Sequence, residues 1–337
     1  MYECTTKKKN RELFFAQGKE YLQANIKENI RYYRLKKTGQ LICEIEFKLG
    51  IVEEAIEIAQ ITDVHINYCL NDSMEDDEVL FTKQCRTWLA NAESVQSIDK
   101  AMDVAQYFDK TVITGDIIDY LSNGAIELTK KHIFMRDPKV ICTLGGHDVT
   151  KQMQTGIKDK LSIEERFEIV KSFWCNDIFY TAQDIKNKII IVGLNNAVGK
   201  YYSSQKVKLE KEIIKARNEN KYIFIFQHEP ISTGNPKDIS VKPSLVASQS
   251  TDKNRDFFNG CMGNPNTNDM ETKAVYNLIT KNADVIKGIF CGHFHSGFYT
   301  EIRATDIYGK KIIIPQICAV GNPYFGHKGV ITRIIVK

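Results

Sequence analysis

Residues 55–66 read AIEIAQITDVHI, an apolar run that ends at Ile61 and is followed by Asp63 and His65. A short run rich in isoleucine and alanine predicts a buried strand. In open α/β sheets, ligands bind beyond the carboxyl ends of the strands, where these two polar side chains would lie. Since residues i and i+2 of an extended strand point to the same side, we expect Asp63 and His65 to face one ligand together.

Four further apolar runs end in polar clusters of the same kind. The clusters are Asp116 with Asp119, His147 with Asp148, His228 alone, and His293 with His295. Together with His65 they hold five of the seven histidines of the chain. A single buried histidine is more often a hydrogen-bonded core residue than a ligand, and we place His132 and His327 in that class. The concentration of the other histidines at strand ends favours one shared site.

The shared site has the residue types of a metal centre. Its candidate ligands are carboxylates and imidazoles: Asp63, His65, Asp116, His228, His293 and His295. A set without thiolate suits Mn²⁺, Fe or Zn²⁺ at a hydrolytic centre better than a structural zinc site, and we favour Mn²⁺. Two such ions, about 3.5 to 4 Å apart, can bridge a hydroxide and clamp a phosphoryl group.

In order and strand context, the clusters resemble the calcineurin-like metallophosphoesterase superfamily. The matching motifs are Asp63-Val64-His65, Gly115-Asp116-Ile117-Ile118-Asp119, Gly145-Gly146-His147-Asp148, His228 and Gly292-His293-Phe294-His295. The resemblance covers about residues 61–295. It implies an α/β fold, a four-layer α/β/β/α sandwich of two mixed sheets flanked by helices, with the C-terminal strands in the second sheet. It also implies a metal-dependent hydrolase of phosphate esters, with monoester or diester left open.

The resemblance also implies how the six ligands divide between two divalent ions. Asp63, His65 and His295 would hold the first ion, His228 and His293 the second, and Asp116 would bridge both. Family members carry an asparagine ligand to the second ion where this chain has Gly146. We therefore expect weaker occupancy of that position, and three amides are candidate replacements: Asn67, Asn195 and Asn196.

The remaining motif residues would carry the proton chemistry. By the resemblance, His147 would protonate the leaving oxygen, and Asp148 would orient His147. Asp119 would steady the ligands or His147, although an aspartate there could instead cap the helix that follows. If the second ion is lost because of Gly146, the chain would be a catalytically weak or inactive metal-binding scaffold that recognises a phosphorylated ligand.

Composition narrows the partners and the compartment. The net charge is only +4, and no basic, aromatic-laced stripe occurs, which argues against nucleic acid and against a nuclease. Tyr120 follows Asp119 where phosphoprotein phosphatases of the superfamily carry arginine, which favours a small-molecule phosphate ester. Nine cysteines without a C-x-x-C pair indicate a reducing compartment. Without an apolar run of about 18 to 20 residues, we expect a cytoplasmic protein.

The order of the predicted elements along the chain indicates an N-terminal extension followed by one large domain. We expect residues 1–50, with a helix over about 10–34, to pack on a metallophosphoesterase domain over 51–337. Insertions at about 66–94 and 231–269 follow motif strands directly, so both should cover the same face. Periodicity predicts further helices over 98–108, 126–134, 162–174 and 204–219, and strands over 41–49, 111–114, 140–144, 189–194, 222–226, 285–290, 298–303, 311–317 and 330–336.

Overall fold

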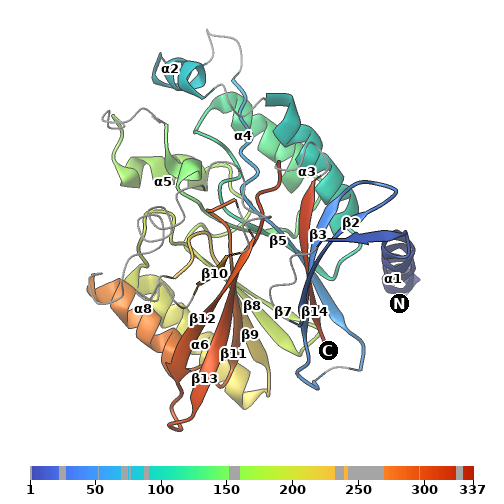
Figure 1. Cartoon of the computed structure of the whole chain (residues 1–337). Helices are drawn as coiled ribbons and strands as arrows, with labels where there is room; N and C mark the ends of the chain where they lie inside the picture. The colour runs from blue at the N-terminus through green and yellow to red at the C-terminus, as the bar shows by residue number, and fades with distance from the viewer. Residues whose placement is uncertain are drawn as a thin grey trace.

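Two mixed sheets, stacked face to face and flanked by helices, form the protein in a computed structural model (Figure 1). The structure describes residues 2–22, 28–51, 53–69, 75, 77–86, 91–151, 160–231, 239–241, 269–295, 297–323 and 329–337. This architecture confirms the predicted α/β class with two mixed sheets between helical layers. Among these residues, no helix is long and apolar enough to cross a membrane.

The first sheet combines the N-terminal half of the chain with its last strand. Its order is β1 (Lys19–Tyr21), β2 (Ile30–Leu35), β3 (Leu41–Phe47), β14 (Val330–Val336), β4 (Ile56–Ile61), β5 (Lys110–Thr114) and β6 (Ile141–Thr143). Strands β4, β5 and β6 are parallel, whereas β14 runs antiparallel to β4 and parallel to β3. The parallel strands therefore end at one edge of the sheet.

The second sheet is built from the C-terminal half. Its order is β10 (Ile239–Val241), β12 (Phe298–Thr305), β13 (Lys311–Cys318), β11 (Ile286–Cys291), β9 (Tyr222–Phe226), β8 (Ile189–Leu194) and β7 (Tyr180–Ile185). Strands β8, β9, β11 and β13 are parallel. All residues of β8 and four of the five residues of β9 are buried, as expected of parallel strands covered on both sides.

Helices flank the two sheets (Figure 1). They are α1 (Tyr2–Phe15), α2 (Asp77–Cys85), α3 (Asn91–Ala105), α4 (Asn123–Thr129) with a π-helical turn (Lys130–Phe134), α5 (Ile163–Lys171), α6 (Ser203–Asn218) and α8 (Met270–Lys281). One hydrophobic core joins α3 to the first sheet, a second fills the space between the sheets, and a third joins α6 and α8 to the second sheet. A capping box formed by Ser162 and Glu165 begins α5.

Several elements differ from the sequence prediction. The predicted helix over 10–34 was wrong, because α1 ends at Phe15 and the buried aromatic run Ile30–Leu35 forms β2. The C-terminal strand β14 lies in the first sheet, between β3 and β4, and not in the second. The strand β7 and the helix α8 were missed.

Two further predictions concern the ends and the insertions. Strands β2 and β3 are hydrogen-bonded members of the first sheet, and the domain boundary at residue 50 stays a prediction. The predicted insertion at 66–94 contains α2. Most of the insertion at 231–269 lies outside the described residues, which there include the edge strand β10.

Candidate metal centre

Strand ends from both sheets meet at one place. The buried Gln60 side chain of β4 donates hydrogen bonds to Thr114 Oγ1 (3.0 Å) at the end of β5 and to the Cys291 carbonyl (3.0 Å) at the end of β11. The amide thereby ties two strands of the first sheet to one strand of the second. The motif residues that follow these strands converge because their strands end side by side.

The paired ligands adopt a backbone different from the one predicted. Five motif residues have left-handed φ angles: Asp63 (49°), His65 (49°), Asp116 (50°), His293 (76°) and His295 (55°). They lie in turns beyond the strand ends, so strand alternation, from which we predicted their common orientation, was the wrong reason. Each left-handed non-glycine residue costs about 1–2 kcal/mol. Such strain at one site is typical of functional geometry that the surrounding structure enforces.

Glycines make the close approach of these turns possible. A Cβ at Gly292 would lie 1.8 Å from Thr62 Oγ1, and one at Gly145 would lie 2.1 Å from Asp116 Oδ1. Gly115 has a φ of +76°, and its Cβ would meet the His228 ring at 2.6 Å. The space that these glycines leave is filled by the candidate ligands and their neighbours.

The first ligand cluster has four donors: Asp63, His65, Asp116 and His295. The Nε2 atoms of His65 and His295 are 2.9 Å apart. His295 Nε2 lies 3.2 Å from Asp63 Oδ1, and His65 Nε2 lies 3.8 Å from Asp116 Oδ2. Asp63, His65 and Asp116 are buried, and His295 is partly exposed at the rim.

The second ligand cluster has three donors: Asp116, His228 and His293. His228 Nε2 lies 3.1 Å from Asp116 Oδ2 and 3.3 Å from His293 Nδ1. Asp116 belongs to both clusters, so a single carboxylate joins two adjacent positions. The structure thus brings together all six side chains that the sequence predicted as ligands.

These donors fit divalent cations in both spacing and tautomer. Metal–donor bonds of about 2.0–2.2 Å place neighbouring donor atoms roughly 3 Å apart, close to the separations here. His228 Nδ1 donates to the Thr114 carbonyl (2.8 Å), and His65 Nδ1 donates to Asp119 Oδ1 (3.0 Å). In their neutral form both rings would therefore carry the proton on Nδ1 and turn Nε2 to the cluster, as metal-binding imidazoles do.

Electrostatics favour a positive charge at the shared carboxylate. Burial alone would raise the pKa of Asp116, but the charges of His228 and His147 hold this pKa well below its usual value. Burial likewise opposes a charge on His228, yet Asp116 raises the pKa of His228 to about 10. Burial, and after it the charge of His228, lowers the pKa of His293 to about 4. The ionised Asp116 stabilises a proton on His228, and a divalent cation would take the place of that proton.

His147 stands beside the clusters and is held by Asp119. Its Nδ1 atom donates to the Asp119 carbonyl (2.8 Å) and lies 3.2 Å from Asp119 Oδ1. The His147 side chain is 23% exposed, more than that of His65, His228 or His295, so a substrate can reach it.

Asp148 has a different part from the one we expected. Its Oδ1 accepts the N–H groups of Ile117 (2.8 Å) and Ile118 (3.0 Å), and its Oδ2 accepts that of Gly145 (2.8 Å). Both oxygens are thus bound to buried backbone, so Asp148 fixes the turns that carry Asp116 and His147. The residue that orients the His147 ring is Asp119.

Asp119 also does not cap the following helix, because Ser122 is the N-cap of α4. Its carboxylate is buried and accepts hydrogen bonds from His65, Asn67 and Arg86. The sequence analysis missed Arg86. Its partner lies 33 positions away, and no local pattern connects the two residues.

The three amides considered as replacement ligands already have backbone or side-chain partners. Asn196 Oδ1 accepts the N–H groups of His228 (3.1 Å) and Glu229 (3.0 Å). Asn195 Oδ1 accepts the Ala197 N–H (2.9 Å), and Asn67 Nδ2 donates to Asp119. As placed, these amides support the loops around the clusters, and each would have to rearrange to become a ligand.

Nothing in the backbone requires glycine at position 146. Gly146 has φ −61° and ψ −38°, an ordinary right-handed conformation. An added Cβ would meet the Ala197 carbonyl oxygen at 3.3 Å, which a shift of a few tenths of an ångström would relieve. The missing ligand is therefore not a consequence of backbone strain.

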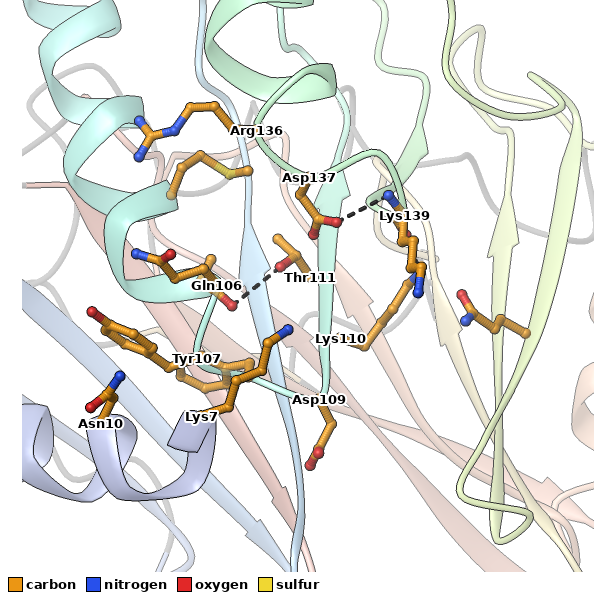
Figure 2. A pocket seen from close by; sticks show the side chains of 14 residues that line it. Lys7, Asn10, Gln106, Tyr107, Asp109, Lys110, Thr111, Arg136, Asp137 and Lys139 are labelled. Carbon is orange, nitrogen blue, oxygen red and sulfur yellow. Dashed lines mark hydrogen bonds between the residues drawn. The ribbon is translucent and has the colours of Figure 1, made fainter. Parts of the chain in front are cut away.

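A separate polar cavity of about 420 Å³ opens at the other end of β5 (Figure 2). Lys7, Asp109, Lys110 and Lys139 are among its lining residues, and none of the motif residues line it. Lys110 and Thr111 at the start of β5 line this cavity, whereas the candidate ligand Asp116 lies beyond the end of the same strand.

Comparison with known proteins gives one family and several distant structures. The family model described as calcineurin-like phosphoesterase matches residues 56–297. No curated protein matches the chain. Solved structures with a similar fold include a dimetal phosphatase from Danio rerio, with 13% identity, TM-score 0.44, and coverage of 82% of this chain and 90% of that one. Another is the purple acid phosphatase PPD1 from yellow lupin (Lupinus luteus), with 11% identity, TM-score 0.42, and coverage of 90% and 48%.

Proposed function

Because the chain belongs to the calcineurin-like phosphoesterase family, we propose that it is a metal-dependent hydrolase of small-molecule phosphate esters. The observation that carries this proposal is the position of Asp116, which is shared by two adjacent clusters of metal-binding side chains. Phosphoryl transfer needs positioning and neutralisation of charge more than covalent help from the protein. Two divalent ions held side by side would supply a water-derived nucleophile and neutralise the phosphoryl oxygens.

The charge balance of the clusters suits a phosphate ester. Asp63 and Asp116 contribute two negative charges, and the four ligand imidazoles are neutral when they bind metal. Two divalent ions would therefore leave a net charge of about +2 on the ligand set, which a phosphate monoester dianion would balance and a diester would halve. The charge of the ligand set therefore favours an anionic phosphate substrate, and both phosphate monoesters and phosphate diesters meet this condition.

His147 is the group we assign as general acid. Asp119 binds its Nδ1 atom and thereby fixes the ring, which leaves Nε2 to donate a proton to the leaving oxygen. Burial would lower the pKa of His147, but Asp116 and Asp119 raise it to about 9 in the metal-free protein. With metal bound to Asp116, the contact with Asp119 would still favour a protonated ring.

The donor types indicate the identity of the metal, and the cysteines indicate the compartment. Oxygen and imidazole donors without thiolate favour Mn²⁺, with Fe and Zn²⁺ as the other candidates. Among the described residues, Cys43, Cys142 and Cys175 carry free thiols. Free thiols suit a reducing compartment, and we propose a cytoplasmic enzyme.

The test is hydrolysis of paired chromogenic phosphate mono- and diesters by metal-stripped protein, with Mn²⁺, Fe²⁺ or Zn²⁺ added back. We expect metal-dependent turnover of at least one ester. With an alkyl ester, whose leaving group needs a proton, His147→Ala should lower turnover by about 100- to 10,000-fold. Full turnover by metal-free protein would contradict the proposal.

Gly146 and the three-donor second cluster support one alternative. A chain that holds only one ion tightly would be a weak or inactive metal-binding scaffold that recognises a phosphorylated ligand. Measurable metal binding without turnover of any ester, whichever metal is added, would favour this alternative.

A further inference from the structure

Arg86 makes a two-point contact with a buried carboxylate beside the metal centre. It follows α2, and its side chain is only 15% exposed. Nε donates to Asp119 Oδ2 (2.9 Å), and a terminal nitrogen donates to Asp119 Oδ1. The Arg86 carbonyl accepts a hydrogen bond from Asn67 Nδ2 (2.8 Å), which also donates to Asp119 (3.0 Å). The guanidinium and its own backbone are therefore both fixed relative to Asp119.

The same carboxylate serves two candidate functional histidines. Asp119 Oδ1 lies 3.0 Å from His65 Nδ1 and 3.2 Å from His147 Nδ1. The rings of His65 and His147 meet edge to face, with centroids 4.6 Å apart. A rotation of the carboxylate would therefore change a contact of a candidate metal ligand, His65, and one of the two Asp119 contacts of His147, whose Nδ1 also donates to the Asp119 backbone carbonyl (2.8 Å).

An arginine fork is suited to prevent that rotation. Two parallel N–H···O bonds fix the plane of a carboxylate, which a single bond does not. The positive charge also offsets the cost of burying an ionised carboxyl, which is large when the charge is unpaired.

We propose that Arg86 is a positioning residue that acts through Asp119 on both His147 and His65. This inference rests on the proposed function for its effect on His147, and on metal binding alone for its effect on His65. Arg86 is not one of the candidate ligands, so its removal should weaken the geometry of the site without removing a donor.

The effect on His147 predicts a dependence on the leaving group. In Arg86→Gln, an alkyl phosphate ester, whose alkoxide needs a proton to depart, should lose about 100-fold in kcat. A nitrophenyl ester, whose leaving group is already a stable anion, should lose less than about 3-fold. Arg86→Lys keeps the charge without the fork and should fall between wild type and Arg86→Gln.

The effect on His65 predicts a change in metal affinity that needs no turnover. Outer contacts of a ligating histidine typically change metal affinity 10- to 100-fold. Arg86 contacts Asp119, which in turn contacts the candidate ligand His65. In Arg86→Gln we therefore expect Mn²⁺ to bind about 10-fold more weakly at the higher-affinity position. Titration of metal-stripped protein, followed by calorimetry and by the electron paramagnetic resonance of free Mn²⁺, measures it.

Arg217→Gln is the matched control. Arg217 makes an equivalent two-point contact with Asp284 (2.8 and 2.7 Å), near the C-terminal end of α6 and away from the clusters. A purely structural loss would affect both variants alike. We expect the control to resemble wild type in leaving-group dependence and in Mn²⁺ affinity, even if its thermal stability falls as much as that of Arg86→Gln.

The outcomes separate this inference from the proposed function. If wild type hydrolyses no ester, the proposed function fails, and the Mn²⁺ titration alone decides for or against Arg86. Equal losses on both esters together with unchanged Mn²⁺ affinity would overturn the inference, as would identical behaviour of the two arginine variants. If Arg86→Gln does not fold, the same comparisons made with Arg86→Lys decide.

Discussion

The two ligand clusters share a carboxylate and differ in almost everything else. The first has four donors, and Asp119 and Arg86 support one of them, His65, from behind. The second has three donors, with the Thr114 carbonyl behind His228 and a glycine at position 146, where the sequence resemblance led us to expect an asparagine ligand. We therefore expect the first ion to bind more tightly than the second. Membership of a two-metal family does not by itself make the two positions equivalent.

Removing the shared carboxylate should weaken metal binding at both clusters and give the largest effect on turnover. Asp116→Asn preserves the shape of the side chain but removes the charge that both clusters use. We expect a loss of the second ion, a weaker first ion, and a fall in turnover of about 1000-fold. Metal content after dialysis and kcat measure this. Retention of two ions with turnover within 10-fold of wild type would show that Asp116 is not the bridge.

Removing one histidine from each cluster should separate the two positions. His293→Ala leaves the second cluster with two donors, so this ion should be lost while the first remains. His295→Ala leaves the first cluster with three donors and should weaken its ion by about 100-fold, the upper end of the range for changes around a metal ligand. Metal stoichiometry and the two dissociation constants distinguish the variants. Equal effects on both ions in both variants would mean that the clusters act as a single site.

Placing an amide at position 146 should make the metal affinities of the two clusters more similar. Gly146→Asn offers a side-chain oxygen at a position with an ordinary backbone conformation. We expect the second ion to bind about 10-fold more tightly, or about 1.4 kcal/mol. Gly146→Ala is the control, because it adds the same Cβ against the Ala197 carbonyl but no ligand. If both variants bind the second ion alike, the amide is not a ligand there.

Loss of the Asn196 amide should give the smallest effect and should concern the second cluster. Asn196→Ala leaves two backbone N–H groups at His228 and Glu229 without their acceptor. We expect the free energy of unfolding to fall by about 2 kcal/mol, with a weaker second ion and an unchanged first ion. Asn195→Ala, which removes one accepted bond, should cost less. Denaturant unfolding and Mn²⁺ titration test this, and a weaker first ion would contradict it.

The strands and the candidate ligands could be predicted from the sequence because both depend on local patterns. The apolar run before Asp63 and the run before His293 identify buried strands, because a strand covered on both faces needs apolar residues throughout. The ligands follow because parallel strands end at one edge. The glycines at 115, 145 and 292 belong to the same motifs, and the crowded turns of the folded protein leave no room for a Cβ atom at these positions.

Other features depended on contacts between distant parts of the chain. The apolar strand β14 could have paired in either sheet, and it lies between β3 and β4 in the first. The left-handed turns at the ligands follow from packing against neighbouring turns, because local preference disfavours them.

The sequence by itself determined the ligand types, their order and the strands that carry them, since these follow from residue chemistry and hydrophobic periodicity. Only the tertiary structure decided which aspartate supports His147, because Asp119 and Asp148 both belong to the site motifs and their contacts in the folded protein separate them. It also decided the role of Arg86, whose contact joins segments 33 residues apart. Side-chain orientation at long range is set by packing, and no local pattern in the chain encodes it.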